Sequence, residues 1–280
     1  MNKFVLKIGI FAVFLLFLMG QAACYADKEG CLDIAAVNFD AAADKDCCCQ
    51  YPKLAFSVEQ IYGDSGEYSA NKVYPGLNGH LFRIKQVNFY LSDAQMIRQG
   101  QAFFTTDSLN FSSFGATQGD TISQRLRNDF VLLSRAALTY TVGSFREIGD
   151  FDQVKVRLGL PDAAQKVIAT RAPAGNVLGV QADSLWYGFD RGYVWAQMIV
   201  VRDSAAATKP DTLAFTAAEL GERYLIGNGV FSHEAGKNFV INLQADYQKL
   251  FENVDWLNGN PATWKPIIVA NLQNVFSFSP

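Results

Sequence analysis

Apolar and polar residues alternate along much of the chain after residue 53, with the period of strands that bury one face. Leu54, Phe56 and Val58 form the first such series. The run 192–203 is apolar at nearly every position, which is typical of a strand buried on both faces. Further short series lie between Gly, Asn and Pro residues, at 151–161, 211–217, 222–229, 237–244 and 275–280. The pattern predicts an all-β fold, an antiparallel β-sandwich with short helices.

Three stretches depart from simple alternation. The apolar series that begins at Phe82 slips by one residue before Val87, so we expect a strand with a β-bulge near Lys85–Gln86. The stretch 128–145 has mixed signals and could form a helical turn or a strand. A helical spacing of one or two turns follows later in the chain, at Tyr247, Leu250, Phe251 and Val254.

The N-terminal residues have a different character from the rest. Two lysines precede an apolar run at 8–19 that is too short to span a bilayer comfortably, and small residues follow it. This pattern predicts a signal peptide at 1–23 and an extracytoplasmic protein, in the periplasm or at the outer membrane. Cys24 resembles the lipid-acceptor cysteine of bacterial lipoproteins, and ordinary cleavage that leaves it free or paired is the alternative. Contact with a membrane is expected only through that lipid.

The segment 24–52 is rich in cysteine and aspartate. After Cys24 it holds every remaining cysteine of the chain, namely Cys31, Cys47, Cys48 and Cys49. Because disulfides persist in an oxidising compartment, we expect Cys31 to bond one of the three adjacent cysteines. The spacing does not select the partner. An unpaired or intermolecular thiol is an alternative for the others, since adjacent cysteines bond only in a strained geometry.

The same segment offers hard oxygen ligands, which suit Ca²⁺. The candidates are Asp33, Asn38, Asp40, Asp44 and Asp46. The alternative is that these residues form solvated turns around a disulfide, because no Asp-x-Asp-x-Asp-Gly run is present.

Composition excludes several functional classes. The net charge of −3 implies no basic face, so nucleic acid is not an expected partner. After 8–19 no apolar run approaches ~18 residues, so no transmembrane helix is expected. The tetrapeptide at 63–66, Gly-Asp-Ser-Gly, matches part of a serine-protease loop, but neither of the two histidines has a context that suggests a catalytic base. We expect a turn there and a protein that is not an enzyme, with a hydrolase as the weaker alternative.

Several short motifs follow one another in a recognisable order. They are Tyr90-Leu91-Ser92, Leu-Gly-Leu-Pro at 158–161, Gly192-Tyr193 after an aromatic cluster, Ile226-Gly227, a helix led by Asp246, and Ala270-Asn271. In this order the body of the chain resembles the MbnP-like family, extracytoplasmic β-sandwich proteins associated with copper binding. The segment 24–52 resembles a separate module of exported proteins of the Bacteroidetes type. The resemblance divides the chain into 1–23, 24–52 and an MbnP-like domain at 53–280.

The resemblance implies a non-catalytic metal-binding protein, for copper, that acts in uptake or storage. The positions at which the family carries histidines are here Glu59 and Leu225. The remaining candidate copper ligands are His80 and His233, since copper favours imidazole, thioether and thiolate groups. The resemblance adds Trp186, which stands in the aromatic cluster where the family has a tryptophan-rich one. The alternative is a metal-free β-sandwich that contacts a partner protein or a glycan through its loops.

Overall fold

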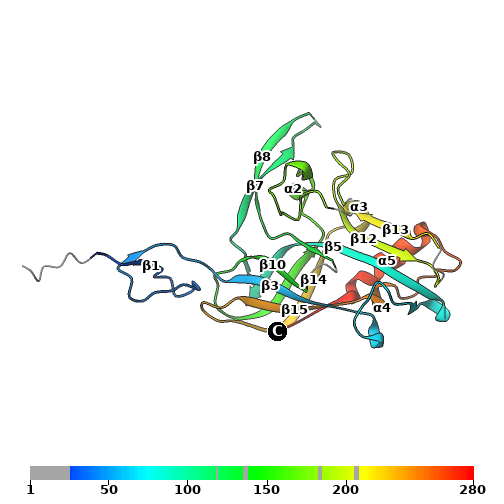
Figure 1. Cartoon of the computed structure of the whole chain (residues 1–280), viewed down its shortest axis with the longest axis horizontal. Helices are drawn as coiled ribbons and strands as arrows, with labels where there is room; N and C mark the ends of the chain where they lie inside the picture. The colour runs from blue at the N-terminus through cyan, green and yellow to red at the C-terminus, as the bar shows by residue number, and fades with distance from the viewer. Residues whose placement is uncertain (1–25, 118, 135–137, 182–184, 205–207) are drawn as a thin grey trace, which may run out of the picture.

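The computed structural model describes residues 26–117, 119–134, 138–181, 185–204 and 208–280 (Figure 1). The predicted signal peptide at 1–23 and the predicted lipid attachment at Cys24 lie outside the described residues. Within the described ranges, no helix combines the length and the apolar character that a membrane crossing needs.

The larger of the two main sheets is built around one long strand, β5, in the order β13–β12–β5–β11–β14. Three further strands, β4, β6 and β9, pair with β5 outside this path. The bounds are β4 Tyr74–Pro75, β5 Leu81–Arg98, β6 Gln101–Phe104, β9 Val131–Leu133, β11 Gly149–Leu158, β12 Val194–Val201, β13 Asp211–Thr216 and β14 Arg223–His233. The stretch 192–203 contains β12, which is buried along nearly its whole length, as predicted.

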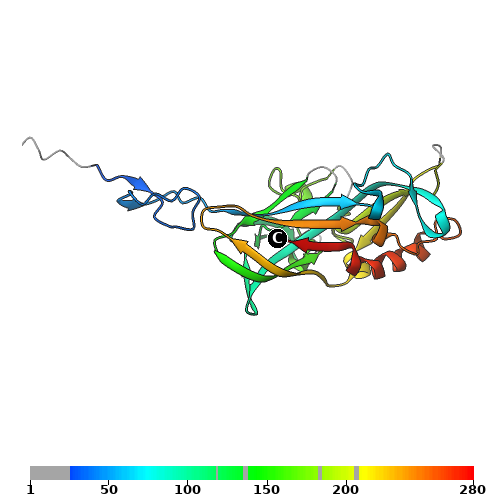
Figure 2. The same cartoon turned by 90° about the horizontal axis from the view of Figure 1, so that it is seen from below.

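The smaller sheet has the order β10–β3–β15–β16. Its strands are β3 Lys53–Ile61, β10 Thr139–Ser144, β15 Phe239–Asp246 and β16 Phe276–Ser279. Figure 2 shows β3, β15 and β16 in front of the larger sheet. The fold is therefore an all-β sandwich, which confirms the predicted class, although β3 and β15 pair in parallel.

Aromatic side chains fill the space between the two sheets. The rings of Phe151 and Phe239 have centroids 5.8 Å apart, and those of Phe89 and Phe276 are 5.2 Å apart. Because each pair joins a strand of one sheet to a strand of the other, the many phenylalanines of the chain form one core.

The predicted bulge in β5 is present. Gln86 pairs with Ile199 and Ile84 pairs with Val200, so Lys85 is the extra residue. The insertion keeps Phe82 and Val87 buried on either side of it, which accounts for the slip in the sequence pattern.

The helices are short, with one exception. They are η1 Gly63–Ser65, η2 Leu77–Gly79, α2 Asp162–Gln165, η3 Ala169–Arg171, α3 Ala217–Leu220, α4 Tyr247–Leu250 and α5 Pro261–Val275. Helix α4 lies in the stretch predicted to be helical, and η1 forms the turn expected at 63–66. Helix α5 was not predicted as a helix, and it packs on α4, β13, β15 and β16. The mixed stretch 128–145 contains the strands β9 and β10.

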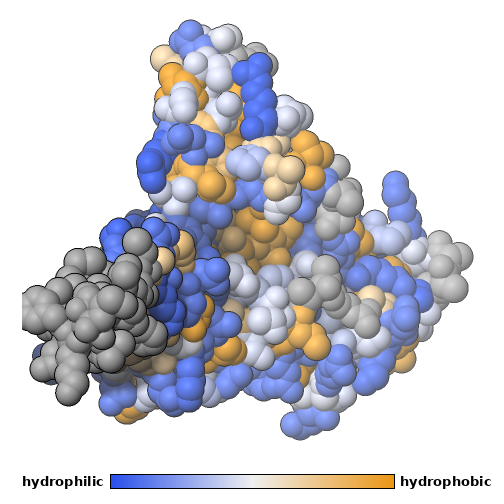
Figure 3. Space-filling view, turned by 60° about the vertical axis from the view of Figure 1, so that its left-hand side comes forward, coloured by the Kyte–Doolittle hydropathy of each residue, from blue (hydrophilic) through white to orange (hydrophobic). Residues whose placement is uncertain are grey.

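Two parts project from the sandwich (Figure 1). The hairpin of β7 (Ser108–Phe114) and β8 (Thr121–Arg127) rises on one side. Figure 3 shows a hollow lined by hydrophobic residues between this upper part and the body. The Cys-rich segment extends from the left-hand end of the body in Figure 1, with the short parallel strands β1 (Glu29–Gly30) and β2 (Lys45–Asp46).

Candidate functional site

Disulfides close the N-terminal segment. Cys31 is bonded to Cys49, with the Cα atoms 4.8 Å apart, so the predicted staple forms with the last of the three candidate partners. Cys47 is bonded to its neighbour Cys48, a pairing that the sequence did not favour. The parallel pairing of β1 with β2 aligns Gly30 with Asp46 and so brings Cys31 close to the cysteines at 47–49.

A carboxylate completes a compact group of donor atoms around the first disulfide. One ligand atom each from Cys31, Asp46 and Cys49 lies within 4.8 Å of the other two. Cys31 is fully buried, and the Oδ1 of Asp46 is 3.4 Å from the sulfur of Cys49. That oxygen also accepts a hydrogen bond of 2.9 Å from the backbone N–H of Leu32, which fixes its direction.

The oxidation state of the sulfurs decides what this group can hold. In the disulfide both sulfurs are bonded to each other and neither is a thiolate, the form that binds metals. In the reduced state the same positions would present two thiols and one carboxylate.

The other four predicted calcium ligands are not gathered into a site. Each instead accepts a local hydrogen bond from the backbone: Ala35 N–H to Asp33, Gln50 N–H to Asn38, Ala42 N–H to Asp40 and Lys28 N–H to Asp44. Asp40 also pairs with the ammonium of Lys28 at 2.7 Å, and this contact lowers the pKa of the Asp40 carboxyl. These side chains therefore act as turn-forming and capping groups.

The three predicted copper ligands lie in separate places. His80 precedes β5 at its N-terminal end, and its Nε2 is 2.6 Å from the carbonyl oxygen of Arg202. His233 ends β14, opposite Gly149, near the C-terminal end of β5. Trp186 forms an isolated β-bridge with Tyr193, which directly precedes β12. The first residues of β12 pair with the middle of β5. The structure does not bring these side chains together.

Both ring nitrogens of His233 contact backbone carbonyl oxygens, and the ring packs in the core. Its Nδ1 is 2.6 Å from the carbonyl oxygen of Glu147, and its Nε2 is 2.8 Å from that of Lys237. The ring is 3% exposed and stacks on Phe239 at 4.9 Å. Both ring nitrogens lie within hydrogen-bond distance of carbonyl oxygens, so an ion could reach either one only by displacing one of these contacts.

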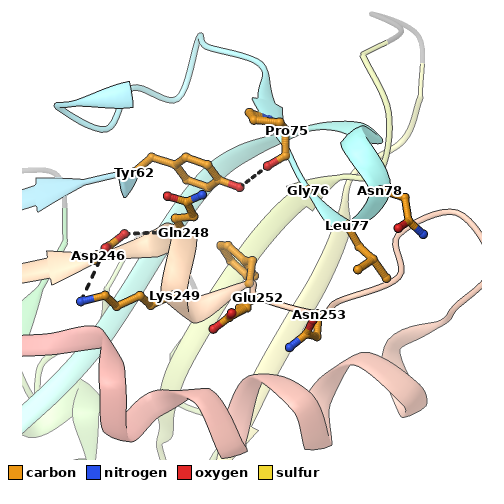
Figure 4. Close-up of a pocket in the computed structure, with 11 residues that line it drawn as sticks. Tyr62, Pro75, Gly76, Leu77, Asn78, Asp246, Gln248, Lys249, Glu252 and Asn253 are labelled. Atoms are coloured by element: carbon orange, nitrogen blue, oxygen red, sulfur yellow. Dashed lines mark hydrogen bonds and ion pairs between the residues drawn. The ribbon is translucent and has the colours of Figure 1, made fainter. Parts of the chain in front are cut away.

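A pocket of about 510 Å³ lies between the end of β3, the turn at η2 and helix α4 (Figure 4). Asp246 organises its floor, because its Oδ1 accepts hydrogen bonds from the backbone N–H groups of Gly63 (3.0 Å) and Gln248 (2.9 Å). The hydroxyl of Tyr62 donates to the carbonyl of Pro75 at 2.6 Å, and burial raises the pKa of this phenol.

The rim of this pocket is polar. It is formed by the exposed residues Asn78, Gln248, Lys249, Glu252 and Asn253. This rim, with amides, one ammonium and one carboxylate, is suited to a polar ligand. The sequence pattern indicates the helix that follows Asp246 but not this pocket, because the two walls of the pocket are far apart in the chain.

No protein-family model and no curated protein matches the chain. Among solved structures the chain is similar to MbnP from Methylosinus trichosporium, with 14% identity and a TM-score of 0.42. The match covers 72% of this chain and 78% of that one. At this level the likeness assigns no function and no residue.

Proposed function

We propose that the protein is an exported, non-catalytic metal-binding protein that holds copper(I) at Cys31, Asp46 and Cys49. The observation that supports this function is the distance of at most 4.8 Å between one ligand atom of each residue. The segment 24–52 follows the predicted signal peptide directly, so the site would face the extracytoplasmic space.

The identity of the donors favours copper(I). Thiolates are soft ligands that select Cu(I) over hard cations, and Asp46 would add one oxygen at the edge of the site. Binding requires the reduced segment. A dithiol reductant would deliver two electrons and two protons to the Cys31–Cys49 bond and become a disulfide itself. The two thiols would release their protons when the ion binds.

Anaerobic titration with Cu(I) against a chromophoric chelator tests this function. The reduced protein is expected to take up one ion per chain, and the oxidised protein none at the same free copper. The double variant Cys31→Ser/Cys49→Ser should lose the site. Cys47→Ser/Cys48→Ser is the matched control, because it removes two neighbouring sulfurs and keeps the proposed ligands.

A second candidate function rests on the pocket of Figure 4. Its polar rim over the buried carboxylate of Asp246 is suited to a glycan bound without metal. Saturation-transfer NMR with a panel of monosaccharides tests it on the oxidised protein. The variant Glu252→Gln should weaken any binding seen, whereas Glu29→Gln in the N-terminal segment should not. If no sugar gives a transfer signal, this candidate is rejected.

A further inference from the structure

A second cavity, of about 390 Å³, lies at the base of the β7–β8 projection. Its walls come from the end of β7, from the residues that close α2, from the loop before β12 and from the start of α3. In Figure 1 these elements meet above the larger sheet. The volume is in the range of ~300–1,000 Å³ that is usual for small-molecule sites.

Aromatic rings form one side of this cavity. Phe114 and Phe189 both line it, and their rings meet edge to face with centroids 5.2 Å apart. Trp186 lies beside Phe114 in a nearly parallel orientation, at 6.4 Å. Phe189 is 38% exposed, so this apolar wall is open to an incoming molecule. The cavity therefore accepts a flat or apolar body.

A hydrogen-bond donor that has no acceptor within the described ranges lies in the lining of the cavity, and a second lies beside it, on the ring that stacks on Phe114. Gln165 lines the cavity, and its Oε1 accepts a hydrogen bond of 3.0 Å from the backbone N–H of Tyr193. This contact fixes the orientation of the amide, and the buried Nε2 is left with no acceptor among the described residues. The buried indole Nε1 of Trp186 also has no acceptor in the described part of the chain. A buried donor without an acceptor is costly, so a ligand that supplies one is favoured.

The charges at the mouth of the cavity favour a negative ligand. Lys166 and Arg191 are exposed lining residues, against the single lining carboxylate of Asp190. A guanidinium can bind a carboxylate through two parallel hydrogen bonds, and a nearby ammonium adds attraction.

We propose that the cavity between Phe114, Gln165 and Arg191 binds a small organic acid with an aromatic body. The ring of the acid packs on Phe114 and Phe189. Its carboxylate accepts from the Nε2 of Gln165 and pairs with Arg191 and Lys166. This site is separate from Cys31, Asp46 and Cys49, and its occupancy does not depend on the oxidation state of the cysteines.

Titration of the oxidised, full-length mature protein with phenylacetate tests the proposal. Calorimetry gives the affinity, and the indole N–H resonances in ¹⁵N-labelled protein give the place. We expect phenylacetate to bind at least tenfold more tightly than its neutral isostere phenylacetamide, and to shift the Trp186 resonance more than those of the other tryptophans. Equal affinities, or no binding of phenylacetate at millimolar concentration, would overturn the proposal.

Two variants and a control locate the carboxylate. Gln165→Glu keeps an acceptor for the N–H of Tyr193 but replaces the donor with a negative charge, so it should weaken phenylacetate binding more than tenfold. Arg191→Gln, on the surface, should weaken it several-fold without a change in folding. Arg146→Gln removes an arginine that lies over Tyr51, outside the cavity, and should leave the affinity unchanged. Wild-type affinity in both site variants would contradict the assignment.

Discussion

His80 and His233 lie at opposite ends of one strand, β5. His80 immediately precedes Leu81, the first residue of that strand, and His233 pairs with Gly149 beyond its last residues. Since a strand rises about 3.3 Å per residue, the 18 residues of β5 place the two imidazoles on the order of 50 Å apart. One ion cannot contact both.

Replacement of His80 by alanine should therefore leave copper uptake unchanged. The expected affinity of the reduced His80→Ala protein for Cu(I) is within twofold of the wild-type value, because His80 lies outside the proposed site. The fold should lose only the contact to the carbonyl of Arg202, about 1 kcal/mol. A tenfold loss of copper affinity in this variant would show that an imidazole is a ligand.

Asp129 should make the stability of the protein depend on pH. Its side chain is 2% exposed, and burial raises its pKa to about 6, although Arg127 lies 3.4 Å away. In the unfolded chain the same carboxyl titrates near its ordinary value, so the folded state binds the proton more tightly. The contribution of Asp129 to the free energy of unfolding should consequently fall, by up to about 3 kcal/mol, as the pH rises from about 4 to above 6.

The variant Asp129→Asn isolates this contribution. It should match the wild-type stability near pH 4 and exceed it at pH 7, as measured by urea denaturation at each pH. Asp190→Asn, at an exposed position, is the control and should give the wild-type profile. If Asp129→Asn is less stable than wild type at pH 7, the ion pair with Arg127 outweighs the cost of burial.

Gly159 should tolerate no side chain. Its φ is +101°, and a Cβ there would lie 2.1 Å from the indole of Trp195. Gly159→Ala should lower the free energy of unfolding by about 2–5 kcal/mol, from backbone strain and overpacking together. Gly175→Ala is the matched control, because its φ is +75° but no atom lies within 4 Å of the added carbon. Its cost should be about 1 kcal/mol, and equal losses in the two variants would exclude the contact with Trp195 as the cause.

The disulfide between Cys31 and Cys49 should stabilise the N-terminal segment locally. It closes a loop with a sequence separation of 18, which corresponds to about 3 kcal/mol in the chain-entropy estimate. In the variant Cys31→Ser/Cys49→Ser, amide hydrogens of 28–47 should exchange faster, whereas those of β5 should not change. Cys47→Ser/Cys48→Ser should leave the exchange as in the wild type, since that bond encloses no intervening loop. Unchanged protection of 28–47 in the first variant would contradict this role.

Much of the fold could be predicted because burial leaves a periodic trace. The slip in β5 locates the bulge at Lys85 to within one residue, and the apolar run at 192–203 identifies β12. Helix α5 also has signals that could have identified it. Asn260 caps it, Pro261 follows at the first position, and Trp264, Ile268 and Leu272 repeat at helical spacing.

Other features depend on contacts that no local pattern specifies. The parallel pairing of Phe56 with Ile241 joins segments about two-thirds of the chain apart. Cys31 had three adjacent candidate partners at nearly equal spacing, and nothing in that spacing selects Cys49, the cysteine to which it is bonded. The three-donor group around Asp46 could not be found from sequence for the same reason.

The stoichiometry of Cu(I) binding to the reduced mature protein tests the proposed metal function most directly. An anaerobic titration should reach saturation at one ion per chain, and oxidation to the Cys31–Cys49 disulfide should abolish binding. Extended X-ray absorption fine structure of the loaded protein should show sulfur in the first shell. Saturation at one ion in the variant Cys31→Ser/Cys49→Ser, or no binding by the reduced wild-type protein at micromolar free copper, would contradict the proposed site.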